Sequence, residues 1–205
     1  MLLKVDASNR IGERVALRGM FEARKRVFVD LLKWDIPVLD GRFEVDRFDD
    51  THAIYIILTD TQCRHLASAR LLPTVRPALL DTLFPELCDG PPPAGDEVFE
   101  ITRFCLSPDI SAAERRILRN QLVSALALFA LENGIETYTG VAETAWLKQI
   151  MAFGWDCRPL GPSCFNGRST LGALRIDIDA DTIPSLQRAG IFAEPDDGFP
   201  SMRAA

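Results

Sequence analysis

Three groups of charged residues stand at positions where a pure scaffold gains nothing from charge. The first is the acidic segment from Glu44 to Asp50, the second is Arg70 within an apolar run, and the third is Glu100 with Arg103 in another. A charge inside a core strand costs free energy unless it is paired. We therefore predict that the acidic segment faces the strand arginines and that together they form a polar cluster at one end of a sheet.

Each of these features also has a purely structural interpretation. Acidic segments are usually solvated, so Asp46 and Asp49 could simply lie at the surface. Arg70 could face solvent from one side of an amphipathic sheet. Glu100 and Arg103 are three positions apart, which places them on opposite faces of a regular strand. They can share a site only if the strand carries a bulge.

The composition narrows the class of protein. The 205 residues include 29 acidic and 23 basic ones, for a net charge of -6, which argues against nucleic acid as the main partner. The five cysteines form no Cys-x-x-Cys pair and only two histidines exist, so we expect neither a disulfide framework nor a metal site. The longest uncharged apolar stretch, 122–131, is too short to span a bilayer. Lys4 and Asp6 interrupt the apolar residues at the N-terminus, so we expect no signal peptide. These features predict a reduced, cytoplasmic protein with no membrane span.

The hydrophobic pattern predicts strands in pairs followed by alternating strands and helices, which is typical of a single α/β or α+β domain over residues 1–205. A capping-box sequence, Ser111 to Glu114, opens the longest helix, and Asn133-Gly134 closes it. A polar tail after Pro195 is expected to be frayed. The expected helices are 10–28, 111–131 and 144–153; the expected strands are 53–59, 66–72 (a hairpin with the first), 98–106, 136–141 and 170–178; and the expected loops are 33–50 and 85–97.

Four short motifs occur in a specific order between about residues 20 and 107. They are Arg24-x-x-x-Phe28-x-x-x-x-x-Trp34, Glu44-x-Asp46-x-Phe48-Asp49, Arg70-Leu-Leu-Pro-Thr74 and Glu100-x-x-Arg103-Phe104. The ordered set resembles the N-acyl-homoserine lactone synthases, the bacterial autoinducer synthases of quorum sensing. One position departs from the family pattern, because Leu31 stands where members usually carry a basic residue or Gln.

The resemblance implies a fold and a reaction. The fold is a splayed mixed β-sheet flanked by helices, similar to the Gcn5-related N-acetyltransferases. The reaction uses S-adenosylmethionine as a substrate and an acyl thioester as donor, with no further cofactor. The methionyl amine attacks the thioester carbonyl, and the carboxylate then attacks the γ-carbon, which closes the lactone and releases methylthioadenosine.

The resemblance also implies a role for each matched residue. Glu100, Asp46 and Arg103 form the catalytic set, with Glu100, acting directly or through water, as the general base. Asp46 and Asp49 would hold the ammonium or offset the sulfonium, and Arg70 would support both. The strand after Phe104 would polarise the thioester carbonyl. The residues expected to bind S-adenosylmethionine are Arg24, Phe28, Trp34, Asp46, Asp49, Arg103 and Phe104.

The acyl pocket is expected within about residues 98–178. Gly140, Ala142 and Trp146 are its predicted lining by analogy, and the small side chains favour an unsubstituted acyl chain. The alternative is that Gly140 and Ala142 only let a helix pack closely. The donor is either acyl carrier protein or acyl-coenzyme A. An acidic carrier would need a basic patch, for which the candidates are Arg115, Arg116, Arg119 and Lys148, although such charges usually form a solvated helix face.

Two other functions compete with this interpretation. A generic acetyl-coenzyme A-dependent N-acetyltransferase usually shows a glycine-rich turn that cradles the pyrophosphate, and here no glycine follows Ser107-Pro108 until Gly134. A catalytically silent homologue that only binds a small molecule would have no need of so many costly charges. Both observations favour the synthase.

Overall fold

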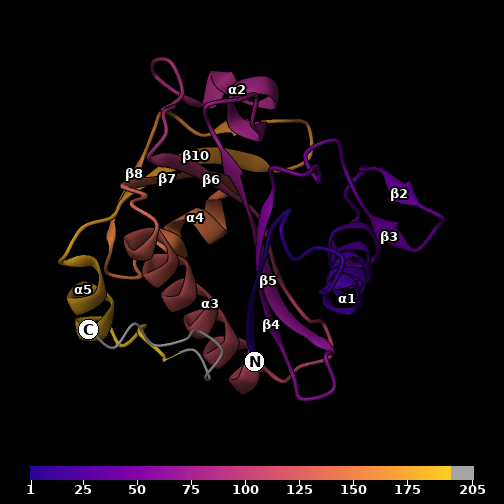
Figure 1. Ribbon diagram of the computed structural model, residues 1–205. Helices are drawn as coiled ribbons and strands as arrows, with labels where there is room; N and C mark the ends of the chain where they lie inside the picture. The colour runs from indigo at the N-terminus through magenta and orange to yellow at the C-terminus, as the bar shows by residue number, and fades with distance from the viewer. Residues whose placement is uncertain (195–205) are drawn as a thin grey trace. The chain divides into compact units, whose positions relative to one another are not determined.

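The computed structural model describes residues 1–194, which divide into two compact units (Figure 1). Among its described residues, unit 1 contains 1–70, 103–125 and 193–194, and unit 2 contains 71–102 and 126–192. No helix among the described residues is long and apolar enough to cross a membrane. The predicted fraying after Pro195 lies outside the described residues, and the single domain stays a prediction.

Unit 1 is built on strands in the order β1, β4, β5 and the second half of β6. Strand β4 reads Ile-Tyr-Ile-Ile-Leu-Thr and is buried along nearly its whole length, as expected for β-branched and aromatic residues in the middle of a sheet. Helix α1 packs beside the small β2–β3 hairpin and continues directly into a π-helix, η1 (Figure 1). The elements of this unit are β1 (Leu2–Val5), α1 (Arg14–Arg24), η1 (Lys25–Leu31), β2 (Val38–Leu39), β3 (Phe43–Glu44), β4 (Ile54–Thr59), most of β5 (His65–Pro73), the end of β6 (Val98–Leu106) and the start of α3 (Ala112–Glu132).

Unit 2 continues with β6 parallel to β7 and with β7 antiparallel to β10, which also pairs with β8 and β9. The sheet is therefore mixed, and helices flank it, as predicted for the fold class. The remaining elements of this unit are α2 (Leu79–Leu83), η2 (Pro85–Leu87), β7 (Thr137–Glu143), α4 (Thr144–Met151), β8 (Asp156–Pro159), β9 (Cys164–Phe165), β10 (Thr170–Asp177) and α5 (Thr182–Arg188).

The two faces of the unit 2 sheet carry different helices. Directly opposed residues of paired strands share a face, so Ala142 lies beside Gly172. A Cβ on Gly172 would meet Leu147 of α4 at 2.7 Å, which places α4 on this face. The opposite face packs Val141 and Ala173 against residues of α2 and η2. Figure 1 shows α2 and α4 on opposite sides of β7 and β10.

Most elements agree with the sequence predictions, and the long helix has the predicted ends. The Ser111 amide donates to the Glu114 carboxylate and the Glu114 amide to the Ser111 hydroxyl, while Gly134 is left-handed after the last turn. The prediction of a helix over 10–28 was wrong at both ends, because 10–13 form turns and a π-helix extends the element to Leu31. The elements that were not predicted are the short ones: β1, β2, β3, α2, η2, β8, β9 and α5.

Candidate active site

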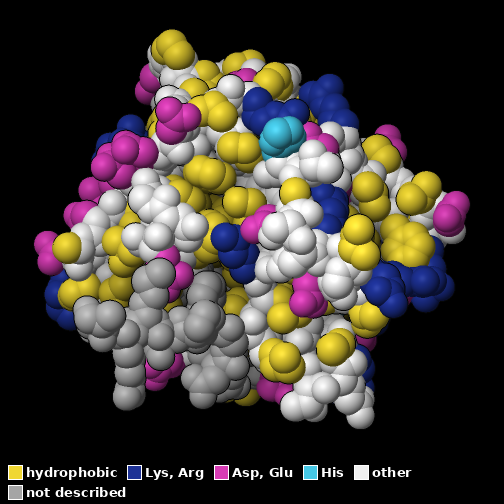
Figure 2. Space-filling view, viewed as in Figure 1, with side chains coloured by type: hydrophobic (Ala, Val, Ile, Leu, Met, Phe, Trp, Pro, Cys, Tyr) yellow, Lys and Arg dark blue, Asp and Glu magenta, His cyan; other side chains and the backbone are white. Residues whose placement is uncertain are grey.

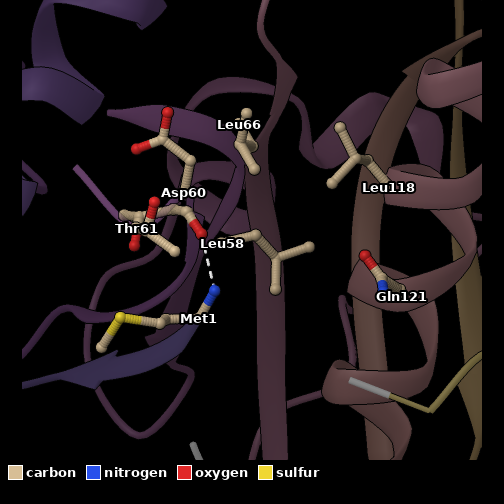
Figure 3. A pocket seen from close by; sticks show the side chains of 8 residues that line it. Met1, Leu58, Asp60, Thr61, Leu66, Leu118 and Gln121 are labelled. Atoms are coloured by element: carbon tan, nitrogen blue, oxygen red, sulfur yellow. Dashed lines mark hydrogen bonds between the residues drawn. The ribbon is translucent and has the colours of Figure 1, made fainter. Parts of the chain in front are cut away.

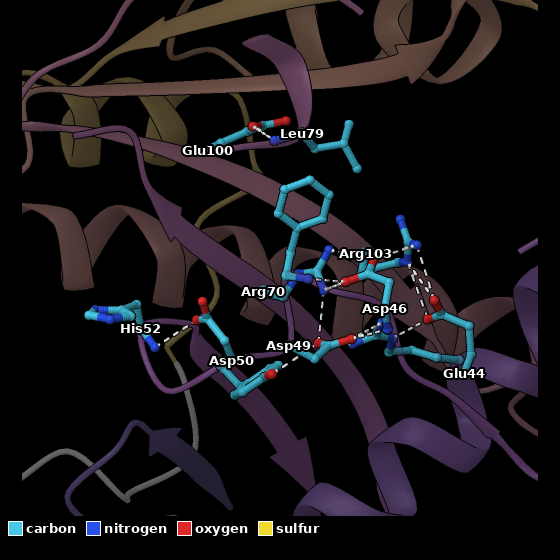
Figure 4. A network of polar contacts seen from close by, with 12 residues as sticks. Glu44, Asp46, Asp49, Asp50, His52, Arg70, Leu79, Glu100 and Arg103 are labelled. Atoms are coloured by element: carbon cyan, nitrogen blue, oxygen red, sulfur yellow. Dashed lines mark hydrogen bonds and ion pairs between the residues drawn. The ribbon is translucent and has the colours of Figure 1, made fainter. Parts of the chain in front are cut away.

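Six charged side chains from four separate segments of unit 1 meet in one network (Figure 4). Helix α1 contributes one arginine at its end, the segment around β3 contributes three acids, and strands β5 and β6 contribute one arginine each. The network contains three cations and three anions, so its formal charge is zero. Its members are Arg24, Glu44, Asp46, Asp49, Arg70 and Arg103.

Arg24 bridges Glu44 and Asp49 and is fully buried. Its Nε donates to Glu44 Oε2 at 2.5 Å, and its two Nη groups form a bidentate pair with Asp49 at 2.8 and 2.9 Å. Burial by itself would lower the pKa of Arg24, but the charges of Asp49 and Glu44 raise it above its ordinary value. Arg24 therefore remains a cation and ties the acidic segment to α1.

Asp49 is the most heavily bonded acid of the network. Arg24 binds both of its oxygens, Arg70 Nη1 lies 2.8 Å from Oδ1, and the Asp46 amide donates to Oδ2 at 2.8 Å. Burial would raise the pKa of Asp49, but Arg24 and Arg70 lower it well below its usual range. The Asp49 side chain is also fully buried, so its charge is neutralised inside the protein and no part of it reaches solvent.

Arg103 has the left-handed backbone conformation (φ 51°) in the middle of β6. Every second residue of this strand is buried at Glu100 and Thr102. The next buried residue is Cys105, three positions further on, so the alternation shifts by one position. This is the local irregularity that the spacing of Glu100 and Arg103 required. The guanidinium donates through Nε and Nη2 to Glu44 and through Nη2 to Asp46 at 2.8 Å.

Two side chains of the network reach its surface. Asp46 is 10% exposed and Arg103 is 9% exposed, whereas Glu44 and Arg70 are fully buried. Arg103 Nη1 makes no hydrogen bond to any other residue in the part of the chain that the structure describes. The network can therefore offer a ligand one carboxylate and one guanidinium donor without breaking an internal pair.

The predicted aromatic residues lie beside this exposed end. The π-helix presents Phe28, and the Trp34 ring stacks on it with centroids 4.7 Å apart and planes 17° from parallel. The Arg103 guanidinium lies 5.7 Å from the Phe28 ring centroid. The Trp34 amide donates to the Phe28 carbonyl at 2.8 Å, which fixes the connection. π-Helical turns are rare and are often found at functional sites.

Glu100 belongs to unit 2 and is fully buried. Its Oε2 accepts hydrogen bonds from the amides of Leu79 and Leu80, at 2.8 and 3.0 Å, at the start of α2. Glu100 also pairs in register with Thr139, so its side chain lies on the face of the sheet that carries α2. These contacts fix the orientation of the carboxylate at the start of α2.

The predicted acyl-pocket residues lie on the other face of the unit 2 sheet. Gly140 and Ala142 share the face against which α4 packs, and a Cβ on Gly140 would already meet the Ile101 carbonyl at 3.1 Å. Trp146 of α4 contacts Phe153 edge to face with centroids 5.7 Å apart. The Gly140 contact is with the neighbouring strand β6, and it is Gly172, the partner of Ala142, that lies close to α4. The roles of Gly140, Ala142 and Trp146 in an acyl pocket therefore stay predictions.

Two residues of the site were not predicted from the sequence. The Tyr55 hydroxyl donates to Asp49 Oδ1 at 2.9 Å, and Arg10 donates to the Asp49 carbonyl at 2.8 Å and to the Tyr55 hydroxyl at 3.3 Å. Tyr55 looked like an ordinary core residue of an apolar strand, and Arg10 precedes the first predicted helix among several polar residues. No spacing signal connects either residue to the acidic segment.

One pocket in unit 1 holds none of the predicted site residues. It has a volume of about 240 Å³ and lies between the β4–β5 turn and helix α3 (Figure 3). Its lining residues are Met1, Leu58, Thr59, Asp60, Thr61, Leu66, Leu118 and Gln121. Within residues 1–194, no group of three or more His, Cys, Asp or Glu side chains is arranged to hold a metal ion.

Most of the chain matches one known protein family. The family model described as autoinducer synthase matches residues 8–186. The chain belongs to the autoinducer synthase family. An acyl-homoserine-lactone synthase of Ralstonia nicotianae is 34% identical over 179 residues, which cover 84% of this chain and 87% of the relative.

Solved structures of acyl-homoserine lactone synthases match nearly the full length of the chain. The coenzyme A-dependent acyl-homoserine lactone synthase MesI is 30% identical with a TM-score of 0.85, and the match covers 97% of this chain and all of MesI. BjaI, solved with S-adenosylmethionine and isopentyl-coenzyme A, is 28% identical with a TM-score of 0.84 over 95% and 92% of the two chains. An acyl-coenzyme A N-acyltransferase from Pseudomonas aeruginosa, 15% identical with a TM-score of 0.54 over 85% of this chain and 98% of its own, confirms the predicted likeness of fold.

Proposed function

We propose that the protein is an acyl-homoserine-lactone synthase that acylates S-adenosylmethionine and then closes the lactone. The observation that carries this proposal is the neutral network of unit 1, which leaves Asp46 and one Arg103 donor at its surface beside the Phe28–Trp34 stack. S-adenosylmethionine presents an ammonium, a carboxylate and a sulfonium, which match a carboxylate, a guanidinium and an aromatic face respectively. Membership of the autoinducer synthase family supports the same reaction.

In this proposal, Arg103 Nη1 binds the substrate carboxylate and Asp46 binds the ammonium. The exposed side of the Trp34 ring stacks on the adenine or faces the sulfonium, because a positive charge is attracted by an aromatic face. Arg70 and Asp49 contact Asp46 directly, and Arg24 binds Glu44 and Asp49. In this proposal these residues hold the binding groups in place and do not touch the substrate. The sequence analysis predicts that Arg24 and Asp49 bind S-adenosylmethionine directly. In this proposal they support the residues that bind it.

The reaction needs a proton acceptor, because the ammonium must lose a proton before the amine attacks the thioester carbonyl. As the carbon–sulfur bond breaks, the donor leaves as a thiol. The substrate carboxylate then attacks the γ-carbon and displaces neutral methylthioadenosine. We assign the acceptor role to Glu100, directly or through a water molecule. The two amides that bind its Oε2 hold this carboxylate in one orientation.

For the acyl chain we propose the face of the unit 2 sheet that carries Glu100, in place of the Gly140 face. On that face, Val141 and Ala173 pack with Leu80 and Leu87 in one apolar cluster. An acyl chain gains about 0.8 kcal/mol for each methylene that it buries, so an apolar lining of this kind favours an unsubstituted chain. Helices pack against both faces, α2 and η2 on this one and α4 on the other, and this face also carries Glu100.

Acyl-coenzyme A is the donor that we propose over an acyl carrier protein. The matched structures of MesI and BjaI are coenzyme A-dependent. Two of the candidate carrier-binding arginines are already engaged, because Arg115 donates to the Ser107 carbonyl and Arg119 to the Asn120 side chain. Basic and acidic side chains are interspersed on the face shown in Figure 2. With a net charge of -6, docking of an acidic carrier is not favoured. Lys148, in unit 2, stays a candidate for either donor.

Turnover with defined donors tests the proposal. The protein is incubated with S-adenosylmethionine and a series of acyl-coenzyme A or acyl-carrier-protein donors, and products are measured by mass spectrometry. We expect equal amounts of methylthioadenosine and acyl-homoserine lactone with coenzyme A donors, and loss of both in Arg103→Met but not in the exposed control Arg26→Met. An acetylated amine without methylthioadenosine would identify an N-acetyltransferase instead. If no donor gives any product, the synthase proposal is wrong and a catalytically silent, small-molecule-binding homologue remains.

We also propose that the enzyme acts in the cytoplasm, where both of its substrates are made. All five cysteines are free thiols, which suits a reducing compartment. Fractionation of cells that produce the protein, followed by the turnover assay on each fraction, tests this location.

A further inference from the structure

Asp49 has more partners than the ion pairs of the network require. Arg24 and Arg70 already neutralise its charge. The Tyr55 hydroxyl adds a hydrogen bond to Oδ1, the same oxygen that Arg24 Nη1 and Arg70 Nη1 bind, while Oδ2 receives the Asp46 amide. Each oxygen therefore has its own set of donors. A carboxylate bound in this way on both oxygens is held at one rotation angle.

The orientation of Asp49 determines the position of Asp46. The Asp46 amide donates to Asp49 Oδ2, and the Asp49 amide donates back to the Asp46 carbonyl at 3.1 Å. These two bonds close the short turn between them. Asp46 is the acid that reaches the surface of the network, so a rotation of the Asp49 carboxylate would displace the group that meets the substrate.

Arg10 secures the opposite side of the same turn. Its Nη2 donates to the Asp49 carbonyl and to the Tyr55 hydroxyl, its Nη1 donates to the Asp50 carbonyl, and its guanidinium lies 5.5 Å from the centre of the Tyr55 ring. Tyr55 is fully buried in β4, and burial together with the Asp49 charge raises the pKa of its hydroxyl above the ordinary value. The hydroxyl thus remains a donor to Asp49 and an acceptor from Arg10.

We propose that Tyr55 and Arg10 are positioning residues for S-adenosylmethionine, which act through Asp49 and the turn that carries Asp46. Neither residue contacts the substrate in this proposal, and neither contributes to the chemistry of acyl transfer. The inference rests on the proposed function, because it assigns Asp46 to the substrate ammonium.

Tyr55→Phe tests the inference with the loss of a single oxygen atom. The chain contains one other tyrosine, Tyr138, which is also fully buried and whose hydroxyl donates to the Leu126 carbonyl at 3.0 Å in unit 2. Tyr138→Phe is therefore a matched control for the loss of a buried hydroxyl. We expect Tyr55→Phe to raise the KM for S-adenosylmethionine about tenfold, the effect of losing one hydrogen bond to a charged group. The kcat and the KM for the acyl donor should stay within about twofold, as for any step that does not contact the reacting atoms.

Three results would overturn the inference. The first is a wild-type KM for S-adenosylmethionine in Tyr55→Phe, and the second is the same rise in Tyr138→Phe. The third concerns Arg10→Met, which should raise the same KM. The refuting result is a double variant, Tyr55→Phe with Arg10→Met, whose rise in KM for S-adenosylmethionine equals the product of the two single rises. The two residues would then act separately, and the shared route through Asp49 would be wrong. Arg10→Lys, which keeps the charge but loses the fork of donors, should recover only part of the affinity.

Calorimetric binding separates this inference from the proposed function. The Kd for S-adenosylmethionine is measured for the wild type, Tyr55→Phe and Tyr138→Phe without an acyl donor. A wild type that binds S-adenosylmethionine but forms no product contradicts the proposed function, and the ratio of Kd values still decides the role of Tyr55. A wild type that forms product while Tyr55→Phe binds equally well contradicts the inference alone.

Discussion

Replacement of Arg24 by Met should destabilise the protein severely, because it removes one of the two cations that each of the buried carboxylates of Glu44 and Asp49 pairs with. Arg24 is fully buried and pairs with Glu44 and with both oxygens of Asp49. Methionine has a similar volume and fills the space without a cavity. The network then holds two cations and three anions in place of three of each. The cost is therefore electrostatic rather than a loss of packing.

The magnitude follows from the burial of the pair. Removing one partner of a buried ion pair costs about 3–5 kcal/mol, which is a large part of a typical stability of about 5–15 kcal/mol. Glu44→Gln should also destabilise, since Arg24 and Arg103 lose the acid that they share. The double variant restores equal numbers of cations and anions. We therefore expect it to be more stable than the sum of the two single effects predicts, by about 2 kcal/mol or more.

Urea denaturation at pH 7 measures the free energy of unfolding for the four members of this cycle. Arg26→Met is the matched control, because Arg26 forms an equally short bidentate pair with Asp109 but is 49% exposed, with Asp109 64% exposed. An exposed pair contributes about 0–1 kcal/mol, so this control should be nearly silent. If Arg24→Met costs no more than Arg26→Met, or if the double variant is strictly additive, the argument from buried charge is refuted.

Two further predictions concern stability. Burial lowers the pKa of His65 from its ordinary 6.5 to about 4. As the pH drops, the unfolded chain therefore binds a proton at this histidine before the folded protein does. The free energy of unfolding should fall by about 3 kcal/mol between about pH 6.5 and about pH 4. His65→Gln should flatten this part of the stability profile, whereas the exposed His52→Gln should keep the wild-type slope; equal slopes in all three proteins would contradict the assignment. Gly161→Ala should destabilise by about 1–3 kcal/mol in thermal unfolding, because the new Cβ would lie 2.7–3.1 Å from three backbone atoms. Gly90→Ala, with open space around the new Cβ, is its control, and equal melting temperatures for the two variants would refute the packing argument.

The sequence was most informative where one short stretch contains all that determines the structure. The β-branched run of β4 and the capping box at Ser111 each specify an element locally, and both have the predicted form. Helix α2 was missed because its five residues cannot form a stable helix alone. The start of this helix is bound by Glu100, which lies about 20 positions further along the chain, and no local pattern records such a contact.

The same limit applies to the site. Charges in apolar strands correctly predicted that Arg70 and Arg103 would meet the acidic segment. The spacing of Glu100 and Arg103 indicated that an irregularity was needed, but not that Arg103 itself would adopt a left-handed conformation. Tyr55 carries no signal, because a strand tyrosine is usual in a core and its role depends on which carboxylate lies above its hydroxyl.

The network also changes how the acidity of the chain relates to its substrate. Three arginines neutralise Glu44, Asp46 and Asp49, so the segment does not attract a cationic substrate by an excess of negative charge. A cluster of well-packed apolar residues would often be as stable as buried ion pairs or more so, which means that stability alone does not explain a network with four fully buried charged side chains. What the pairs achieve is orientation. Four rigidly bonded members hold Asp46 and Arg103 at the surface in one arrangement, and a ligand that carries both an ammonium and a carboxylate needs both groups at a fixed separation.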